Sequence, residues 1–406
     1  MNRVHAMLYA LRQRLKQIRF LRCLVFLLRL VRVGLTRLAL SPLCLLPLQT
    51  NKLFFYLYGG TGYSCNLGAI LRELTSRKRP LQIIWATPHP QCLQSPPRDN
   101  VRVVKARTLR AYFHQLTARA IVISDHLPPE VPRRPAQFLV NAWHGGMNYK
   151  RIGPQACQLS YRAARLLFRL SNPCPNVVLA GSRFFAQDMA QAFGYPEEIF
   201  CPTGLPRNDA LFKPGEVIRN QVCRAVDCPP DCRLALYAPT FRKEAQERPI
   251  DLDICRLCAV LSEKFGGKWQ ILYRAHSLIS HPSGNREHLL DVSHYPEMSD
   301  LLIAADVLIS DYSSCLWDYA LTHKPAFVYA PDYASFQNAD RAFAYPPKAW
   351  PWPICQDLQE LESSIRHFDA ETYQHAIANH LRQCGSYDTG SASRQTVDLI
   401  LSSLSL

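Results

Sequence analysis

Short apolar runs alternate with helical patterns along most of the chain after Thr50. Within the first half, runs that are typical of buried strands occur at residues 52–60, 81–88, 120–125, 138–146, 176–181 and 199–204. Amphipathic helical patterns, such as that at 182–194, separate several of them. Strands that alternate with helices are typical of βαβ units and of the parallel sheets that these units build. The pattern therefore predicts an α/β domain with a doubly wound parallel sheet.

A second series of strand-like runs begins after residue 230. These runs lie at residues 233–242, 269–277, 306–314 and 325–331. Between the two series, residues 204–216 are rich in turn-forming residues, and we interpret them as a hinge. We therefore expect a leader at 1–50 and two doubly wound domains, at 51–212 and 213–406, that face each other across a cleft.

The leader has a different texture from the rest of the chain. Residues 20–48 are rich in Leu and Val, but arginines interrupt them, so no run reaches the ~18 apolar residues expected of a membrane-spanning helix. A signal peptide fits poorly, because charge runs through the apolar region instead of preceding it. Residues 1–50 contain nine Arg or Lys and no acid, and Glu73 is the first acidic residue.

Basic residues of the leader fall on one helical arc, with Leu15, Ile18 and Leu21 off that arc. Such a helix can lie in a membrane interface, with its bases on anionic headgroups and its leucines among the acyl chains. Alternatively, the helix packs on the surface of the protein itself and exposes a solvated basic face. The bases of the arc are Arg12, Lys16, Arg19 and Arg22.

The formal net charge of +15 belongs mainly to this leader, and charged residues make up only 19% of the chain. A nucleic-acid binder would instead carry its charge on the body beside a recognisable module, so we expect no nucleic-acid partner. The 15 cysteines do not have the spacing of a disulfide framework. One group of cysteines allows two interpretations: it forms a zinc site, or its members are reduced cysteines of the hydrophobic core. Its members are Cys223, Cys228, Cys232, Cys255 and Cys258.

Polar residues follow several of the predicted strands, at the ends where doubly wound sheets bind their ligands. In the first half, His144, Gly145, Gly146 and Lys150 follow the strand-like run that starts at 138. In the second half, the ends of three strands carry further candidates. These are Thr240, Arg242, Arg274, His276, Asp311, Ser313 and Ser314.

Ser313 and Ser314 stand at the start of a predicted helix. Hydroxyls and backbone N–H groups at such a position bind phosphate, but serine is also a common helix N-cap. The cations and imidazoles expected at the neighbouring strand ends favour anion binding, because buried strand interiors do not require them.

The two histidines suggest different roles in phosphoryl transfer. This reaction needs neutralisation of charge around phosphorus and an oriented hydroxyl nucleophile. A histidine can accept the proton of that hydroxyl, and a second histidine or an arginine can hold the diphosphate. Gly145 and Gly146 beside His144 allow the backbone to approach a ligand closely.

Five stretches give the sequence a family resemblance: residues 143–153, 203–212, 237–242, 274–276 and 291–336. In these stretches the chain resembles the CDP-glycerol glycerophosphotransferases, which make wall teichoic acids and related glycerol-phosphate polymers. The resemblance implies the two-domain GT-B fold. It also implies transfer of glycerol phosphate from CDP-glycerol to a hydroxyl of a lipid-linked or polymer acceptor, with release of CMP. A peripheral location on the cytoplasmic face of the bacterial inner or plasma membrane is implied as well, with no cofactor and no metal.

The resemblance also implies roles for individual residues. His144 would be the general base, and His276 with Arg274 would contact the donor diphosphate. The remaining roles are donor binding by Asp291, Ser293, Met298, Asp311, Ser313 and Ser314, and support of the cleft by Arg207, Asn208 and Asp209.

The chain departs from the family pattern at Gly146 to Lys150, at Ser277 and at Phe241. These departures keep the two histidines but leave the donor and acceptor open. A CDP-ribitol or nucleotide-sugar transferase of the same fold and a non-catalytic subunit of a polysaccharide assembly complex are therefore alternatives.

Overall fold

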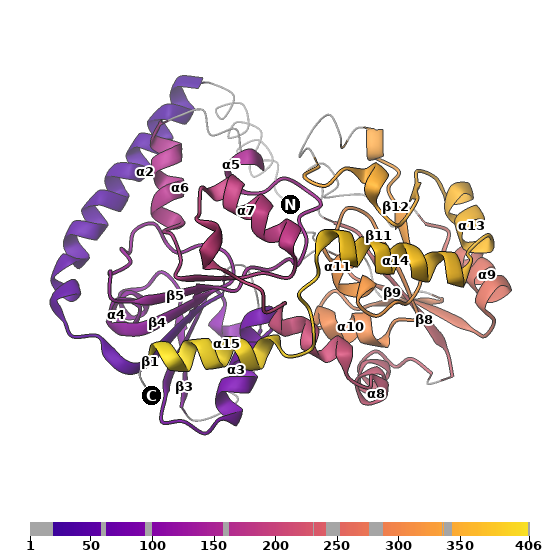
Figure 1. Cartoon of the computed structure of the whole chain (residues 1–406), viewed down its shortest axis with the longest axis horizontal. Helices are drawn as coiled ribbons and strands as arrows, with labels where there is room; N and C mark the ends of the chain where they lie inside the picture. The colour runs from indigo at the N-terminus through magenta and orange to yellow at the C-terminus, as the bar shows by residue number, and fades with distance from the viewer. Residues whose placement is uncertain are drawn as a thin grey trace, which may run out of the picture.

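The structure is a computed structural model that describes residues 19–57, 62–93, 100–156, 162–229, 231–240, 252–275, 287–334, 336 and 343–404. Two α/β halves lie side by side in it (Figure 1). Each half is built around one parallel sheet with helices on both faces. This confirms the α/β class and the two parallel sheets that the alternating pattern predicts.

The sheet of the first half has seven strands in the order β3-β2-β1-β4-β5-β6-β7. Every neighbouring pair is parallel. The chain thus builds outward from β1 in one direction and then from β4 in the other, which is the doubly wound arrangement. The strands are β1 (Gln49–Tyr56), β2 (Gln82–Thr87), β3 (Val101–Lys105), β4 (Ala118–Ile123), β5 (Phe138–Asn141), β6 (Val177–Leu179) and β7 (Phe200–Cys201).

The sheet of the second half repeats this arrangement with six parallel strands in the order β10-β9-β8-β11-β12-β13. Its order reverses between β8 and β11, just as the first sheet reverses between β1 and β4. The strands are β8 (Arg233–Ala238), β9 (Trp269–Tyr273), β10 (Leu289–Asp291), β11 (Val307–Ser310), β12 (Ala326–Tyr329) and β13 (Ile354–Cys355).

Helices connect the strands and bury the faces of both sheets. In the first half these helices are α3 (Cys65–Ser76), α4 (Leu109–Thr117), α5 (Gly153–Ala156), α6 (Arg162–Ser171) and α7 (Arg183–Phe193). The second half contains α8 (Glu216–Ala225), α9 (Ile254–Phe265), α10 (Met298–Ala304), α11 (Cys315–Ala320), α13 (Leu358–Arg366) and α14 (Ala370–Cys384). Short 3-10 helices include η1 (Ser41–Leu45), η2 (Pro90–Cys92), η3 (Glu197–Ile199), η4 (Pro206–Phe212) and η5 (Pro347–Ala349).

Successive residues of each strand contribute to opposite hydrophobic clusters. In β1, Leu53 and Phe55 face one cluster, whereas Phe54 and Tyr56 face the other. In β8, Leu234 and Leu236 alternate with Ala235 and Tyr237 in the same way. This alternation explains the continuous apolar runs, since a strand buried on both faces has no polar side.

The last helix, α15 (Ala392–Ser403), packs on the first half although it ends the chain. Its Val397 and Ile400 join the cluster that contains Leu67 and Ile70 of α3. In Figure 1, the yellow α15 lies beside α3, beneath the first sheet. The expected second domain of 213–406 therefore sends its last residues back to the first half, which a division at one point of the chain does not anticipate.

The expected leader is described only from residue 19, so the proposed basic arc lies largely outside the described residues. The described part forms α2 (Arg19–Leu40), which runs along the outer edge of the first half beside α6 (Figure 1). Val33 and Leu40 are buried there, and Arg37 donates hydrogen bonds to the carbonyl oxygens of Pro129 and Leu170. No helix in the described part of the chain combines the length and apolar character needed to cross a bilayer.

Candidate functional site

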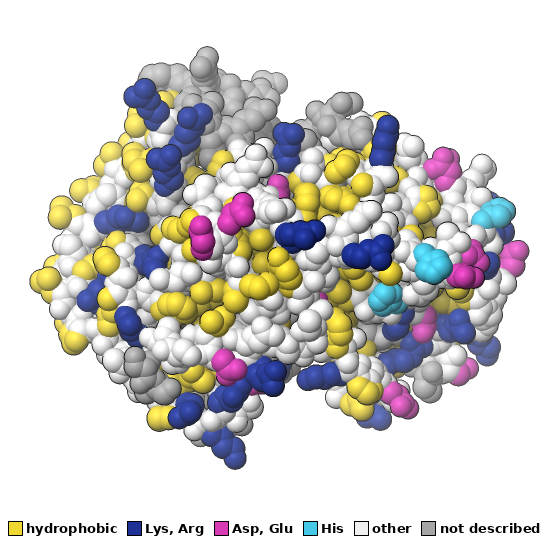
Figure 2. Space-filling model, viewed as in Figure 1, with side chains coloured by type: hydrophobic (Ala, Val, Ile, Leu, Met, Phe, Trp, Pro, Cys, Tyr) yellow, Lys and Arg dark blue, Asp and Glu magenta, His cyan; other side chains and the backbone are white. Residues whose placement is uncertain are grey.

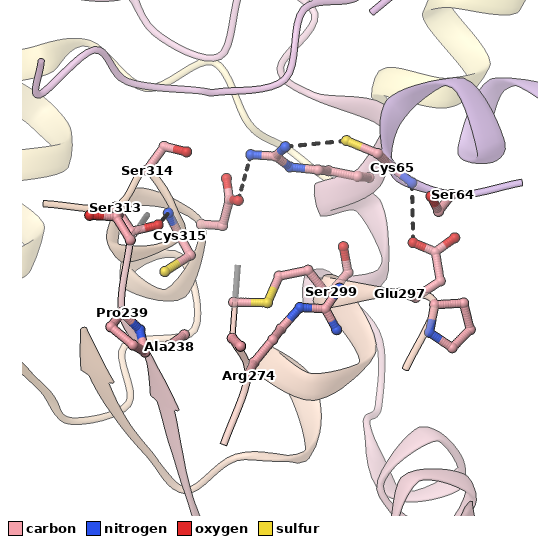
Figure 3. Close-up of a pocket in the computed structure, with 16 residues that line it drawn as sticks. Ser64, Cys65, Ala238, Pro239, Arg274, Glu297, Ser299, Ser313, Ser314 and Cys315 are labelled. Carbon is pink, nitrogen blue, oxygen red and sulfur yellow. Dashed lines mark hydrogen bonds and ion pairs between the residues drawn. The ribbon is translucent and has the colours of Figure 1, made fainter. Parts of the chain in front are cut away.

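A cavity of about 270 Å³ lies between the two halves, where the strand order of the second sheet reverses. Loops that follow β8, β9 and β11 form one wall, and the start of α3 from the first half forms the other (Figure 3). Ligands of doubly wound sheets bind at this position. The lining residues are Ser64, Cys65, Arg207, Ala238, Pro239, Thr240, Arg274, Ala275, Pro296, Glu297, Met298, Ser299, Ser313, Ser314, Cys315 and Asp318.

Ser313 and Ser314 line the cavity as the sequence predicts. The hydroxyl oxygen of Ser313 accepts a weak bond from the Cys315 backbone N–H (3.4 Å), whereas the Ser314 hydroxyl makes no capping bond. Simple capping therefore does not account for Ser314. Helix α11 spans only six residues, so the hydroxyls and nearby cations must supply most of the attraction for an anion.

Arg274 supplies a cation on the same wall. Its Nη1 donates to the carbonyl oxygen of Tyr295 (2.8 Å). Among the described residues, no carboxylate lies within ion-pair distance of this guanidinium, although Glu297 lines the same cavity. Burial lowers the pKa of Arg274 from its ordinary value, and Glu297 partly opposes that shift. The side chain still carries a charge near neutral pH, because arginine starts from such a high pKa.

Asp311 is buried behind the cavity wall rather than in it. Its carboxylate accepts hydrogen bonds from the backbone N–H of Thr240 at 3.1 and 2.9 Å and from the Thr240 hydroxyl at 3.0 Å. These bonds tie the loop after β8 to the end of β11 across the point where the strand order reverses. Asp311 thus positions the loop that carries Thr240, and Thr240 itself lines the cavity.

Asp291 and Ser293 likewise support the wall from behind. One carboxylate oxygen of Asp291 accepts bonds from the Ser293 backbone N–H (2.9 Å) and hydroxyl (2.6 Å). The Ser293 hydroxyl oxygen accepts the Ala275 N–H (2.9 Å), which fixes the loop that carries Arg274. Asp291, Ser293 and Met298 are all expected to bind the donor, and of these only Met298 lines the cavity.

His144 is exposed and follows β5, the neighbour of β4 in the first sheet. Its Nδ1 lies 3.2 Å from the carbonyl oxygen of Ser124, which follows β4. Its ring stacks on Trp143, whose φ of +48° is rare for a non-glycine residue. Backbone strain of this kind persists where packing enforces it and is frequent at functional sites. The Ser124 carbonyl oxygen and the Trp143 ring together hold the imidazole in place.

Gly146 lets the His144 loop approach the second half. A Cβ at this position would lie 2.5 Å from Cδ1 and 2.6 Å from Nε1 of Trp317, a fully buried side chain of α11. A Cβ at Gly145 would lie 3.6 Å from the Ser314 Oγ, which is ordinary contact. The loop of the predicted base and the predicted phosphate-binding turn thus come together because position 146 has no side chain.

Arg207 joins the two walls of the site. Its Nη1 donates to the His144 carbonyl oxygen (2.6 Å) and to the Cys65 Sγ (3.3 Å). Its Nη2 donates to the Asp318 carboxylate on α11 (2.6 Å). The side chains of Arg207 and Asp318 are only 10% and 5% exposed, so this is a buried ion pair. The pKa of Asp318 is nevertheless raised, because burial outweighs the attraction of Arg207.

Asn208 and Asp209 also lie at the expected hinge, within η4. Asn208 donates to Asp318 and to Asp388, both at 3.2 Å, and Asp388 further accepts from the Leu205 N–H (2.8 Å). Burial raises the pKa of Asp388 to about 6. Asp209 accepts the backbone N–H groups of residues 392 and 393 and so caps α15. The two residues thus connect η4 to α11 and to the start of α15, and neither lines the cavity.

The start of α3 brings residues to the cavity that the sequence analysis missed. Ser64 and Cys65 line it, and Cys65 has φ +58°. The carboxylate of Glu297 accepts the Cys65 N–H (3.2 Å) and pairs with Arg72 (3.0 Å), which links the two halves across the cavity (Figure 3). Burial raises the pKa of Glu297. A signal was present, since a glycine-containing turn followed by a helix after the first strand is where many doubly wound domains bind phosphate.

Three further predicted residues are not among the described residues that line the cavity. His276 and Arg242 fall outside the described residues. Lys150 pairs its backbone with Phe343 of the second half and places its Nζ 6.0 Å from the ring centroid of Phe336. It therefore joins the two halves away from the cavity lining.

The cysteine group does not assemble in one place. Cys223, Cys228 and Cys232 belong to one hydrophobic cluster of the second half, Cys258 belongs to another, and Cys255 is exposed. Within the described ranges, no group of three or more His, Cys, Asp or Glu is arranged to hold a metal ion.

The sequence profile described as "CDP-Glycerol:Poly(glycerophosphate) glycerophosphotransferase" matches residues 39–402. The chain is 26% identical over 376 residues to a teichoic acid poly(glycerol phosphate) polymerase of Staphylococcus epidermidis, covering 87% of the chain and 50% of that protein. It is 25% identical over 370 residues to a teichoic acid glycerol-phosphate transferase of Staphylococcus aureus, covering 86% of the chain and 92% of that protein. It is also 25% identical over 305 residues to a teichoic acid ribitol-phosphate primase of Bacillus spizizenii, covering 72% and 77%.

The chain spans about half the length of the polymerases from Staphylococcus epidermidis and Bacillus subtilis that it matches. Among solved structures, the wall teichoic acid polymerase TagF superimposes with a TM-score of 0.79 at 23% identity. The superposition covers 95% of this chain and 98% of that one. At this identity the likeness shows the fold, which is GT-B-like.

Proposed function

The chain belongs to the CDP-glycerol:poly(glycerophosphate) glycerophosphotransferase family, and we propose that it transfers glycerol phosphate from CDP-glycerol to a hydroxyl of a cell-surface polymer or its primer. The observation that carries the proposal is the cavity between the halves. In it, Ser314 has a hydroxyl not used for capping and Arg274 has a charge without an ion-pair partner among the described residues. Both groups suit a diphosphate.

The donor's diphosphate would lie against Ser313, Ser314 and Arg274, with the nucleoside toward Met298 and the glycerol end toward the rim. The guanidinium neutralises charge that the leaving nucleotide gains as the bond to phosphorus breaks. His276 lies two positions after Arg274 in the sequence, and its proposed contact with the diphosphate rests on the family resemblance alone.

His144 would act as the general base. The acceptor's hydroxyl oxygen attacks the β-phosphorus, its proton passes to the imidazole, and the bond from the β-phosphorus to the bridging oxygen breaks. CMP leaves with that oxygen, and glycerol phosphate becomes esterified to the acceptor. The Ser124 carbonyl oxygen lies 3.2 Å from Nδ1, and we propose that this contact holds the ring with Nε2 toward the reacting hydroxyl. This chemistry draws on residues of the chain itself, and we propose that it uses no cofactor.

The test is to incubate the protein with a glycerol-phosphate primer and, separately, CDP-glycerol, CDP-ribitol and several nucleotide sugars, and to identify the released nucleotide. We expect CMP with CDP-glycerol and one glycerol phosphate incorporated for each CMP. A faster reaction with CDP-ribitol or a nucleotide sugar would move the chain to that donor class. No transfer with any donor would support a non-catalytic subunit and would end the proposal.

We also propose that α2 rests on an anionic membrane surface, at the cytoplasmic face of the bacterial inner or plasma membrane, where a lipid-linked acceptor would be reached. The side of α2 away from the protein is apolar, with exposed side chains at intervals of three and four residues. Apolar side chains line the left edge of the molecule in Figure 2, where α2 runs in Figure 1. These residues are Leu24, Leu28, Val31, Leu35 and Leu38, between 40% and 71% exposed.

Arg29 and Arg32 are exposed on the same helix, which suits a surface with acidic headgroups. Sedimentation with vesicles of phosphatidylglycerol tests the proposal. Leu28→Gln/Leu35→Gln should reduce binding, and the matched variant Val217→Gln, at an exposed position of α8, should bind as the wild type does. Equal binding of all three proteins would refute the proposal. A concentration-dependent dimer that is lost in the double variant would instead show that the apolar side of α2 contacts a second copy of the chain.

A further inference from the structure

A second cavity, of about 610 Å³, opens beside the first on the surface of the first half. Helix α3, the hinge helix η4 and the start of α15 form its walls. Figure 2 shows Lys and Arg side chains along the lower edge of the molecule, the region of α3, α15 and α8 in Figure 1. The proposed chemistry of the first cavity makes no use of this space.

The second cavity has an excess of positive charge. Arg72, Lys213 and Arg394 line it, and the last two are exposed with no ion-pair partner among the described residues. Its two acids are engaged elsewhere. Glu73 accepts a bond from Arg77 (2.7 Å), and Asp209 accepts the N–H groups at the start of α15.

The two cavities are adjacent and share a wall. Arg207 lines both of them. Arg72 lines the second cavity, and its guanidinium pairs with Glu297, which lines the first. A chain molecule lying in the second cavity would therefore contact Arg207, which also lines the proposed reaction site.

We propose that the second cavity binds the acceptor as an anionic phosphodiester chain, with its terminal hydroxyl in the first cavity. This inference rests on the proposed function, because the product of glycerol-phosphate transfer carries one negative charge for each added unit. Exposed lysine and arginine attract such a chain without fixing its register, so the chain can shift by one unit after each addition.

The lining also argues against a second nucleotide at this position. None of the described residues that line the cavity is aromatic, so these residues offer a base no ring on which to stack. Small and hydroxyl-bearing residues, including Ser76, Ser391 and Ser393, fill the space between the cations. Such a surface suits a flexible polyol-phosphate chain, which presents hydroxyls and phosphates in alternation.

The test compares acceptors that carry one and about ten glycerol-phosphate units, with CDP-glycerol as donor. We expect Lys213→Glu/Arg394→Glu to raise KM for the long acceptor at least about tenfold and to raise KM for the one-unit acceptor clearly less. Lys264→Glu/Lys348→Glu reverses two exposed lysines that line neither cavity and should leave the ratio of the two KM values as in the wild type. In the wild type, added salt should reduce the difference between the KM values for the two acceptors, because salt screens the attraction of the phosphates to the exposed cations.

Equal changes in KM for both acceptors in Lys213→Glu/Arg394→Glu, or no change at all, would overturn the inference. The same shift in the Lys264→Glu/Lys348→Glu control would also overturn it, because net charge and not this cavity would then decide. Failure of the proposed function is distinguishable, since the wild type would then transfer nothing from CDP-glycerol to either acceptor.

Discussion

Replacing Arg207 by methionine would remove the charge that connects the two walls of the site. Methionine has a similar length and stays apolar, so the substitution leaves little cavity. It removes the hydrogen bonds to the His144 carbonyl oxygen and to the Cys65 sulfur, and it leaves the Asp318 carboxylate without its partner. Asn208 would remain as a donor to Asp318 at 3.2 Å.

The expected cost follows from burial. Both side chains of the pair are at most 10% exposed, and removing one partner of a buried ion pair costs roughly 3–5 kcal/mol, because the other charge stays buried. Transfer should fall as well. Displacement of the His144 loop by about 1 Å is enough to reduce a rate roughly 100-fold.

Chemical denaturation at several pH values measures the stability change. Without Arg207, the pKa of Asp318 should rise further, because burial already raises it in the presence of the arginine. An acid whose folded-state pKa exceeds its unfolded value adds stability at low pH and loses it as pH rises to the folded pKa. Arg207→Met should therefore be closest to the wild type near pH 4 and weakest above neutral pH.

The double variant Arg207→Met/Asp318→Leu separates stability from positioning. It should recover part of the lost unfolding free energy, because no buried charge remains, while transfer stays low. An unfolding free energy for Arg207→Met within about 1 kcal/mol of the wild type at pH 7.5 would contradict the reasoning, since a buried unpaired carboxylate cannot be so well tolerated.

Three further predictions follow from single contacts. Gly146→Ala should lower the free energy of unfolding by about 1–3 kcal/mol, because its Cβ would meet Trp317 at 2.5 Å. Gly145→Ala should cost less, because its Cβ would meet Ser314 at 3.6 Å. Thermal denaturation compares the two variants, and equal melting temperatures would contradict the packing described. Asp388→Asn should remove the part of the pH dependence of the unfolding free energy that comes from the Asp388 carboxyl. A pKa raised from 3.8 to about 6 corresponds to about 3 kcal/mol of stability, which the wild type loses as pH rises over this range. A difference in unfolding free energy between the two proteins that stays constant from pH 4 to 7 would refute it. Ser314→Ala should weaken CDP-glycerol binding about tenfold by loss of one hydrogen bond to a charged group, and calorimetry with the exposed control Ser402→Ala checks this.

Much of the fold follows from local pattern. Strands such as β1 and β11 are buried on both faces, so their apolar runs stand out in the sequence. The strands β3, β10 and β13 were missed. The last two span only three and two residues, and β3 at the sheet edge carries exposed Arg102 and Lys105. Edge strands are expected to differ in this way, because one side has no neighbouring strand.

The candidate site was predictable where the chemistry stands at strand ends. Ser313, Ser314 and Arg274 line the cavity, and Arg207 braces it. Whether a carboxylate such as Asp311 faces the ligand or lies behind the wall depends on which side of a loop it occupies, and periodicity does not encode this. Contacts across the cleft join residues that are far apart in the sequence, as Glu297 and Arg72 are at 225 positions. A local sequence pattern therefore could not predict them.

The packing of α15 on the first half was equally hidden. Its buried residues, such as Val397 and Ile400, show that it needs an apolar surface. The sequence pattern does not say whether the nearer sheet or the farther one supplies that surface, and the Asp209 cap at its start becomes visible only in three dimensions.

We propose that the donor's diphosphate lies between the halves against Ser313, Ser314 and Arg274, with His144 opposite. A crystal structure of the His144→Asn variant with CDP-glycerol tests it most directly. We expect the β-phosphate to lie within hydrogen-bond distance of the Ser314 hydroxyl. We also expect the substituted side chain at position 144 to face the same phosphorus from the rim. A diphosphate bound elsewhere, or a side chain at position 144 turned away from a phosphate seated in the cavity, would contradict it.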